Sequence, residues 1–485
     1  MAERSEERAT SPQVVSRFAE IAFLVLVAAL LSVQLFVSPI VGVANNGDFS
    51  RVMEPLGIVP PAEIGPAAYF DWVVPRYRFD ISRVWLHGLC CYSSSTVLAV
   101  LAVPVGFLIS PPGDLDVRAI GIVNVLGFLA ATCLLVLASR PLSPAARLVA
   151  GLLYVAAFTD VSYATYFNSF YTEPAALIFF LSSLGFALLL AERRSPSGWL
   201  ISGFFVSGAL LSTSRPQNAL LGIPLGLLGA RLLWNDRRRS RRALAAAAAV
   251  ALSAVSLAYL RSTPRPLGRI HLYNAVFREL LAGSDDPARD LSELGLPPQF
   301  SRLAGDSGFS SAAPIADPRF RDVFDARAGY GRLARFYLAH PKRLWTALEG
   351  SAEHAFEIRP LHIGNYAREA GRSPAARSES FDLWSRAKEG FVPARPWFVI
   401  GFLAINLAAT ITLHASARDR TGAAAAEIWT AVVFVASFEF SISAVLDRES
   451  RRSLFLFNAS CDLLFVGLAS WIAAQTGARS KARSR

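Results

Sequence analysis

The sequence has little charge for its length. Only 18% of its 485 residues are Asp, Glu, Lys or Arg, whereas 53% are hydrophobic. A soluble chain of this size carries more charge and spreads its apolar residues periodically, instead of gathering them in runs of about 20. The composition therefore excludes an ordinary soluble enzyme and predicts a polytopic membrane protein.

Cysteine is also scarce. The chain has four cysteines, of which Cys90 and Cys91 are adjacent, and their spacing indicates neither a disulfide framework nor a metal site. The formal net charge of +11 lies largely in short basic clusters between apolar runs, where it orients the spans. We therefore expect no nucleic-acid partner.

Apolar runs suited to spanning helices occur along most of the chain, although some are shorter than the roughly 20 residues usually needed. They are 21–43, 120–138, 148–163, 175–191, 199–211, 219–234, 243–260, 397–414, 424–446 and 454–474. A further stretch, 96–110, contains Pro104 and Gly106, so it either crosses or lies re-entrant at the surface. We expect an all-α fold with about 10–12 transmembrane helices, the first of them retained as an anchor.

The basic clusters predict the orientation. Arginines gather at 193–194, 237–242, 418–420 and 479–485, which we expect to be cytoplasmic. The segments 166–173, 214–218, 261–396 and 447–453 then lie outside. Asp48 shares that side only if 96–110 does not fully cross, which is the arrangement we favour.

Three parts follow from this layout. We expect an N-terminal transmembrane module, 1–260, with a first outer loop at 44–95 whose aromatics and arginines suit interfacial helices. Residues 261–396 are predicted to form an extracytoplasmic subdomain. Residues 397–485 supply the last spans and a basic tail.

Polar residues concentrate at the predicted outer ends of the spans. Asn46 and Asp48 follow the first run, and Asn168, Tyr171 and Glu173 lie between two apolar runs with almost no loop. Ionisable groups at membrane depth are costly and usually face a cavity or a partner. The pattern predicts a polar chamber on one side of the membrane.

This mixture of side chains suits transfer of a sugar from a lipid phosphate. The attacking hydroxyl must lose a proton, so one carboxylate base is needed. Phosphate leaves as a stable anion, so it needs positive charge instead of a general acid, whereas a glycosidase would require two carboxylates across the sugar. Amides and aromatic faces can hold the pyranose.

The candidate residues divide by these roles. Asp48 is the predicted base. The predicted sugar-binding residues are Asn46, Asn168, Tyr171, Glu173 and Gln217, and the predicted donor-phosphate residues are Arg215, Arg452 and His271.

Each assignment has a structural alternative. Asp48 could cap a helix, since Asn-Gly-Asp is typical of turns. Glu173, before Pro174, could begin a helix, and Arg215 could extend to the headgroups. Arg451 and Arg452 could pair with Glu449. The amides of Asn46 and Asn168 could serve turns or helix packing.

Several motifs carry a family resemblance. They are Asn45-Asn46-Gly47-Asp48-Phe49, the segment 166–174, Arg215-Pro216-Gln217-Asn218, Tyr273–Phe277, Leu294–Pro297 and the segment 451–464. At these positions the chain resembles bacterial surface-glycan hexose transferases of the S-layer type (WsfD-like), polytopic proteins similar to the GT-C glycosyltransferases. One departure is Arg452-Ser453-Leu454, where the family pattern has a histidine in place of Ser453.

The resemblance implies a GT-C-like architecture with chemistry on the extracytoplasmic face. It implies a polyprenyl-phosphate sugar donor, a glycan or lipid-linked acceptor, and a catalytic acid in the first outer loop, which Asp48 matches. Some GT-C enzymes use a divalent metal, so a metal is left open and no other cofactor is expected.

The sequence thus predicts a hexosyltransferase of the cytoplasmic membrane, surrounded by lipid, with its active site facing outward. Two alternatives are a flippase or transporter of lipid-linked glycans and a non-catalytic subunit of a surface-polymer assembly machine. A transporter would need polar groups through the full membrane depth, often in repeated halves. We find no such repeat.

Overall fold

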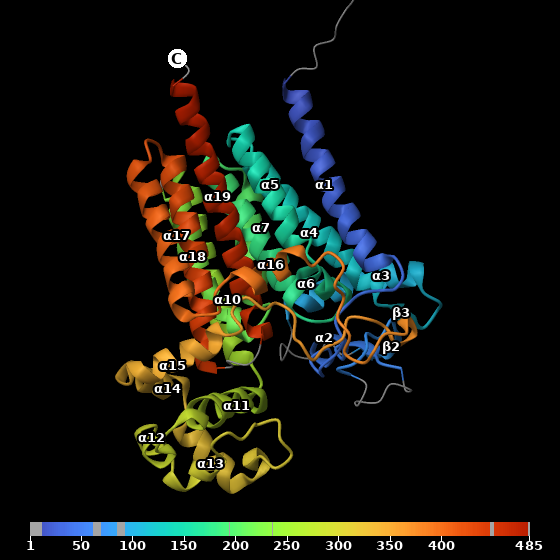
Figure 1. Ribbon diagram of the computed structural model, residues 1–485, viewed down its shortest axis with the longest axis vertical. Coiled ribbons are helices and arrows are strands. Elements are labelled where there is room, and N and C mark those ends of the chain that lie inside the picture. Colours follow the sequence, from blue (N-terminus) through green and yellow to red (C-terminus); the bar gives the residue numbers. More distant parts are fainter. Residues whose placement is uncertain are drawn as a thin grey trace, which may run out of the picture.

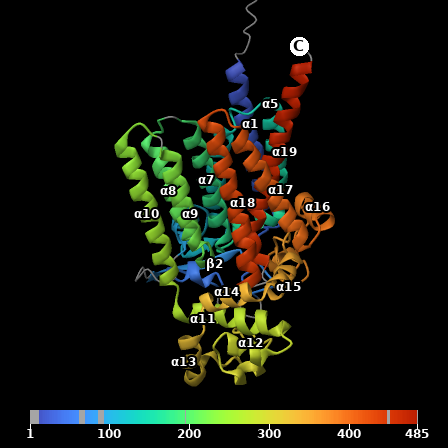
Figure 2. The same ribbon diagram turned by 90° about the vertical axis from the view of Figure 1, so that its left-hand side faces the viewer.

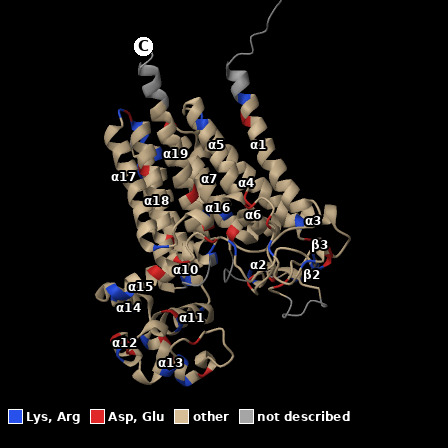
Figure 3. Cartoon of the chain, viewed as in Figure 1, with Lys and Arg blue, Asp and Glu red and all other residues tan. Residues whose placement is uncertain are grey.

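The computed structural model describes residues 12–61, 69–84, 93–193, 195–234, 236–446 and 451–483, with side chains described for all of these except 12–16, 451 and 477–483. Long helices run side by side as a bundle, and α1 begins at the same end at which α19 finishes (Figure 1). We call this the terminal end and the opposite one the distal end. Along the bundle most residues are uncharged, and charge gathers towards both ends (Figure 3).

The predicted mostly helical, polytopic fold is confirmed. Among the described residues, seven helices are long and apolar enough to cross a membrane. They lie in α1 (Pro12–Phe36), α4 (Arg118–Ala138), α7 (Glu173–Glu192), α10 (Arg239–Ser262), α17 (Pro396–Ser416), α18 (Arg420–Leu446) and α19 (Phe455–Arg483).

The remaining predicted spans are broken or short. Helix α5 (Pro144–Phe158) and the segment Val161–Asn168 are long enough to cross only as a pair, which is bent by 53°. Helices α8 (Gly198–Ser212) and α9 (Gly222–Leu233) are shorter than a full crossing. All ten predicted runs contain helix, but by length and composition the described residues contain seven candidate spans, or eight if the bent pair is one span, which is fewer than the ten to twelve expected.

Local chemistry explains these breaks. At the bend, Asp160 caps α6 (Val161–Ala164), because its Oδ1 accepts a hydrogen bond of 2.9 Å from the Ser162 amide. After α8, Arg215 is extended because it precedes Pro216, which disfavours helix at the preceding residue. The chain resumes as η3 (Pro216–Leu221) and then α9.

Helix α3 (Ser94–Ile109), which contains most of the stretch 96–110, does not cross the bundle. At its start, the Ser94 amide donates to the Thr213 carbonyl at 3.0 Å, at the distal end of α8. At its other end, Gly106 packs against Leu115, just before α4 begins. Both ends of α3 therefore lie at the distal end, as the favoured prediction required.

The first loop was predicted to contain interfacial helices, and this prediction is wrong for most of its described part. Apart from α2 (Ser50–Met53), the loop supplies β1 (Leu56–Val59) and β2 (Arg76–Val84), which form an antiparallel sheet with β3 (Asp114–Asp116) in the order β1-β2-β3. Tyr77 is buried between exposed arginines, so the period of two typical of a half-buried strand was present in the sequence.

The long segment after α10 has a core of its own. Its helical elements are α11 (Arg265–Tyr273), the π-helical η4 (Asn274–Leu280), η5 (Leu281–Gly283), α12 (Pro287–Glu293), η6 (Pro298–Leu303), η7 (Pro314–Ala316), α13 (Pro318–Arg327), α14 (Tyr330–Ala339) and α15 (Pro341–Ala352). Tyr273, Phe277 and Phe324 are buried at the centre of this unit, which lies beyond the distal end of the bundle (Figure 1). The following residues return to the bundle, where Phe356 and Ile358 join its main core.

Helix α16 (Leu383–Phe391) is fastened to the bundle by charge. The other carboxylate oxygen of Asp160 accepts from the amides of Trp384 and Ser385, each at 2.9 Å. The Lys388 ammonium, almost fully buried, donates to Asp462 on α19 at 2.9 Å. The segment therefore braces both the bend after α5 and the start of α19.

Gly121 on α4 provides a test of the packing beneath the first loop. A methyl group at Gly121 would lie 1.9 Å from Oδ1 of Asn168, whose amide nitrogen donates to the carbonyls of Leu35 and Val41, each at 2.8 Å. Because Asn168 is fixed, we expect Gly121→Ala to destabilise the protein by about 1–3 kcal/mol. Thermal unfolding in detergent measures the effect.

Gly401→Ala is the matched control for this prediction. Gly401 also lies in a long helix, α17, but open space surrounds its Cβ position. The Gly401→Ala substitution should leave the free energy of unfolding unchanged or raise it by up to about 1 kcal/mol. Equal unfolding temperatures for the two variants would contradict the proposed role of Asn168.

Candidate functional site

Asp48 is held in a tight turn immediately after the first span. The Asn45 Oδ1 accepts from the amides of Gly47 at 2.8 Å and Phe49 at 3.3 Å, and the Asn46 Oδ1 accepts from the Asp48 amide at 3.2 Å. Gly47 has φ +102°, a conformation that favours glycine. The two asparagines thus make the turn, which leaves the Asp48 carboxylate for other partners and removes the helix-cap alternative.

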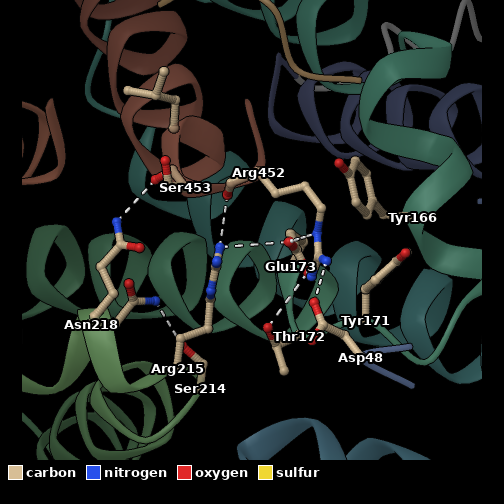
Figure 4. A network of polar contacts seen from close by, with 12 residues as sticks. Asp48, Tyr166, Tyr171, Thr172, Glu173, Ser214, Arg215, Asn218, Arg452 and Ser453 are labelled. Carbon is tan, nitrogen blue, oxygen red and sulfur yellow. Dashed lines mark hydrogen bonds and ion pairs between the residues drawn. The ribbon is translucent and has the colours of Figure 1, made fainter. Parts of the chain in front are cut away.

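Arg452 is the centre of the polar network (Figure 4). Its Nη1 donates to Asp48 Oδ2 at 2.6 Å, and its Nε and Nη2 donate to the two Glu173 oxygens at 2.7 and 3.3 Å. The face of the guanidinium lies 3.8 Å from the centre of the Tyr171 ring. Segments far apart in the sequence are therefore joined by one side chain.

Tyr171 also fixes the loop that carries Asp48. Its hydroxyl donates to the Ala44 carbonyl at 2.8 Å and accepts from the Asn46 amide at 3.1 Å. The Phe49 ring packs edge-on against Tyr171 at 4.6 Å between ring centres. With both its ring and its hydroxyl in use, Tyr171 positions Asn46 and Asp48 relative to Arg452.

Arg215 and Gln217 approach the network from the other side. The Arg215 Nη1 donates to the Arg452 carbonyl at 2.8 Å and lies 3.6 Å from Glu173 Oε1. The Gln217 amide nitrogen donates to Glu439 Oε2 at 2.5 Å and to the Ser453 carbonyl at 2.9 Å. The short η3 helix thus fixes the backbone that carries Arg452.

The network becomes more exposed from Glu173 outward. The Glu173 side chain is fully buried and that of Arg452 is 10% exposed, whereas Arg215, Asp48 and Arg51 are 20%, 31% and 37% exposed. Arg51 binds the outer oxygen of Asp48 at 2.9 Å. A ligand arriving from outside would meet Arg51, Asp48 and Arg215 before it met Arg452 or Glu173.

The charges around Asp48 determine its protonation. Burial alone raises the pKa of Asp48, but the attraction of Arg452 and Arg51 outweighs it and lowers the pKa from 3.8 to about 2. The carboxylate is therefore ionised at neutral pH. While both arginines hold it, it is a weak proton acceptor.

His271 belongs to the electrostatic surroundings of the same cluster. Burial lowers the pKa of His271, and the neighbouring charges of Arg51 and Arg215 lower it further, against a smaller opposite effect of Asp48. The imidazole, on α11, is therefore neutral at neutral pH and can donate one hydrogen bond. It is the contribution of the long segment after α10 to the site.

The structure brings together Asn46, Asp48, Tyr171, Glu173, Arg215, Gln217 and Arg452, with His271 within electrostatic reach. It does not bring Asn168 there, because that side chain faces α4 and the end of α1. The predicted alternative of an Arg452–Glu449 pair lies outside the described residues, and Arg452 is bound by other carboxylates.

Three features were given no role from the sequence alone. Arg51 follows Asp48 by three residues, a spacing that brings side chains together on a helical turn. Glu439 is an acid inside a predicted span, where an ionisable residue usually has a partner. The sequence also contains one Asp-x-Asp motif, Asp114-Leu115-Asp116, an arrangement of acids that was not recognised as a candidate metal site.

The residues that the structure describes do not form a ready metal site. Both oxygens of Asp116 bind Arg118, at 2.7 and 3.0 Å, and both oxygens of Asp48 bind arginines. Within the described part of the chain, no group of three or more His, Cys, Asp or Glu side chains could hold a metal ion. We therefore derive no step through a metal.

The fold and the distal cluster define a multi-pass helical membrane protein. The chain belongs to the family described as the YfdI N-terminal transmembrane domain, whose model matches residues 7–485. This is the family shown, in place of the S-layer type that the motifs resemble. No curated protein matches the sequence.

One solved structure is similar over most of this chain. It is the archaeal oligosaccharyltransferase AglB from Archaeoglobus fulgidus in complex with an inhibitory peptide and a dolichol-phosphate, with 13% identity and a TM-score of 0.43. The match covers 93% of this chain and 50% of that one. This chain therefore spans about half the length of AglB.

The buried ion pair leads to a stability prediction. Glu173→Gln removes the carboxylate that neutralises Arg452 in its buried position, so we expect a loss of about 3–5 kcal/mol. Arg51→Gln, the matched control, breaks a partly exposed pair and should cost about 1 kcal/mol or less. Thermal unfolding of both variants in detergent tests the contrast, and equal losses would show that Glu173 is not the anchor of Arg452.

Proposed function

We propose that the protein transfers a hexose from a polyprenyl-phosphate donor to a cell-surface glycan or lipid-linked acceptor. The observation that carries the proposal is one partly exposed carboxylate, Asp48, held between arginines at the distal end of a membrane bundle. The arginine-rich segments 237–242 and 418–420 lie at the opposite, terminal end, which we assign to the cytoplasm by the positive-inside rule. The site would then face outward from the cytoplasmic membrane.

In the proposed reaction, Asp48 accepts the proton of the acceptor hydroxyl. The hydroxyl oxygen forms a bond to the anomeric carbon, the bond from that carbon to the phosphate oxygen breaks, and polyprenyl phosphate leaves with the electron pair. Arg215, Arg51 and the neutral His271 would hold the phosphate as its negative charge grows. A GT-C-like mechanism of this kind needs one carboxylate and no general acid.

The contacts support a proposed assignment of roles among the predicted residues. Every nitrogen of the Arg452 guanidinium already donates to Asp48 or Glu173, so we assign Arg452, Glu173 and Tyr171 to positioning Asp48. Arg51 and Arg215 are the more exposed cations and are the better phosphate contacts. Asn46, partly exposed beside Asp48, is our candidate for contact with the sugar, and Gln217 supports Arg452 through the Ser453 carbonyl.

Because the pKa of Asp48 is low in the free protein, we give the donor a second role, which is to raise that pKa. A bound phosphate competes for Arg51, and its negative charge offsets the arginines that stabilise the carboxylate. The pKa of Asp48 should then rise, which makes it a stronger base only when the donor is present. The acceptor would be deprotonated in the complex and not in the free enzyme.

The first test is substitution of the base. Asp48→Asn should lower transfer about 100- to 10,000-fold, the usual contribution of a general base, in a purified-protein assay with a panel of polyprenyl-phosphate hexoses. Asp80→Asn is the matched control, because Asp80 is an exposed carboxylate of the same loop, paired with Arg83 at 3.1 Å. It should transfer at about the wild-type rate.

The alternatives give different results in this experiment. A flippase, transporter or assembly subunit would keep its activity in cells with Asp48→Asn, provided that the variant elutes from a sizing column as the wild type does. Failure with every lipid-linked donor, together with transfer from nucleotide sugars, would refute the proposed donor.

The second test is the pH profile. Because kcat/KM reports the free enzyme and kcat the donor complex, the acid limb of kcat should lie about one pH unit or more above that of kcat/KM. Arg51→Gln should move the acid limb of kcat/KM to higher pH and so narrow the separation between the acid limbs of kcat and kcat/KM. Arg83→Gln should leave both limbs where they are in the wild type. Coincident limbs in the wild type would contradict competition for Arg51.

A further inference from the structure

A groove of about 480 Å³ lies towards the terminal end of the bundle, far from Asp48. It is bounded by the end of α9, the last turns of α17 and the first turns of α18, and Figure 2 shows α9 beside α18. Helix α18 begins at Arg420 here and finishes at Leu446, only a few residues before Arg452. At 1.5 Å per residue, Glu427 in the groove lies about 18 Å along α18 from Glu439, whose carboxylate binds Gln217 at the distal site.

The groove is apolar along its walls and charged at its mouth. Its walls include Leu227, Leu228 and Ile411, of which Leu227 and Ile411 are well exposed. Arg231 and Glu427 form an ion pair of 2.9 Å across it, from α9 to α18. The Arg231 side chain is 55% exposed and that of Glu427 is 23% exposed, so the pair is open to a further partner.

The depth of the charged pair indicates a lipid headgroup. Glu427 lies about two turns inside α18, whose first residue, Arg420, donates to the Leu232 carbonyl at the end of α9 at 2.5 Å. That depth is where headgroups meet acyl chains, so exposed charges there meet lipid phosphate and not bulk hydrocarbon. The apolar walls then face an acyl chain.

The two signs of charge select among headgroups. A guanidinium pairs well with phosphate, but the adjacent Glu427 carboxylate repels a headgroup that carries only negative charge. A headgroup with an ammonium as well as a phosphate satisfies both residues. We infer that the groove between α9, α17 and α18 binds a zwitterionic phospholipid such as phosphatidylethanolamine, with its phosphate at Arg231 and its ammonium at Glu427.

This inference does not depend on the proposed transferase activity. The groove lies at the other end of the bundle and shares no residue with the Arg452 network. A donor whose phosphate binds at Arg215 cannot place that phosphate at Arg231. A lipid here would instead join α9 to the α17–α18 pair, at the place where α9 is too short to cover them.

Native mass spectrometry of the delipidated full-length protein tests the inference. The protein is titrated with equal amounts of phosphatidylethanolamine and phosphatidylglycerol of the same acyl chains. We expect phosphatidylethanolamine adducts to exceed phosphatidylglycerol adducts about threefold or more, as one partly exposed ion pair would provide. Polyprenyl phosphate added as a third competitor should bind less well than phosphatidylethanolamine.

Variants test the contribution of the two charges and that of the groove's shape one at a time. Glu427→Gln should abolish the preference for phosphatidylethanolamine, Arg231→Ala should reduce adducts of both lipids, and Leu228→Trp should fill the groove and reduce both without altering charge. Arg237→Ala, an exposed arginine at the same end but outside the groove, is the control and should bind as the wild type does. Equal binding of the two phospholipids by the wild type, or adducts unaffected by Glu427→Gln and Leu228→Trp, would overturn the inference.

Discussion

The buried guanidinium of Arg452 is the constraint on which the distal end depends. A charge removed from water in this way persists only when it is paired and hydrogen-bonded, and Arg452 meets both conditions through Glu173, Asp48 and the Tyr171 ring. These partners come from the first loop and the start of α7, whereas Arg452 directly precedes α19. The requirement to neutralise one cation therefore fixes how the first, middle and last parts of the bundle meet, and it fixes Asp48 as a consequence.

The sequence was sufficient to predict that this end of the bundle would be polar. Ionisable groups beside apolar runs are costly, so Asp48, Glu173, Arg215 and Arg452 were recognisable as a set. Their pairing was not, since it depends on which of several acids and arginines face each other after folding. Arg452 was predicted to bind phosphate, yet its donors are occupied by protein. The partly exposed Arg51 was given no role, although its spacing of three residues from Asp48 is that of a helical turn.

The same contrast holds for the fold. Long apolar runs predicted the helices well, because the hydrocarbon thickness sets a minimum length. Asn168 shows where that reasoning fails: it lies in the same polar segment as Tyr171 and Glu173, but the bend after α5 turns it towards the end of α1. The sheet of the first loop was missed for a different reason. Its aromatics and arginines suit an interface, and only the alternation around Tyr77 indicates a strand.

The charged groups of the site are ordered from the buried interior of the protein to its surface. The fully buried carboxylate of Glu173 fixes Arg452 from within, whereas the outer rim presents the guanidiniums of Arg51 and Arg215 with His271 nearby. An anion approaching from outside therefore meets positive charge first, and Asp48 lies just behind it. If the anion takes over the role of Asp48 as the partner of Arg51, the carboxylate regains basicity at the moment when a leaving group is in place. The ion pairs that weaken Asp48 as a base in the free protein would thus restrict its activity to the complex with the donor.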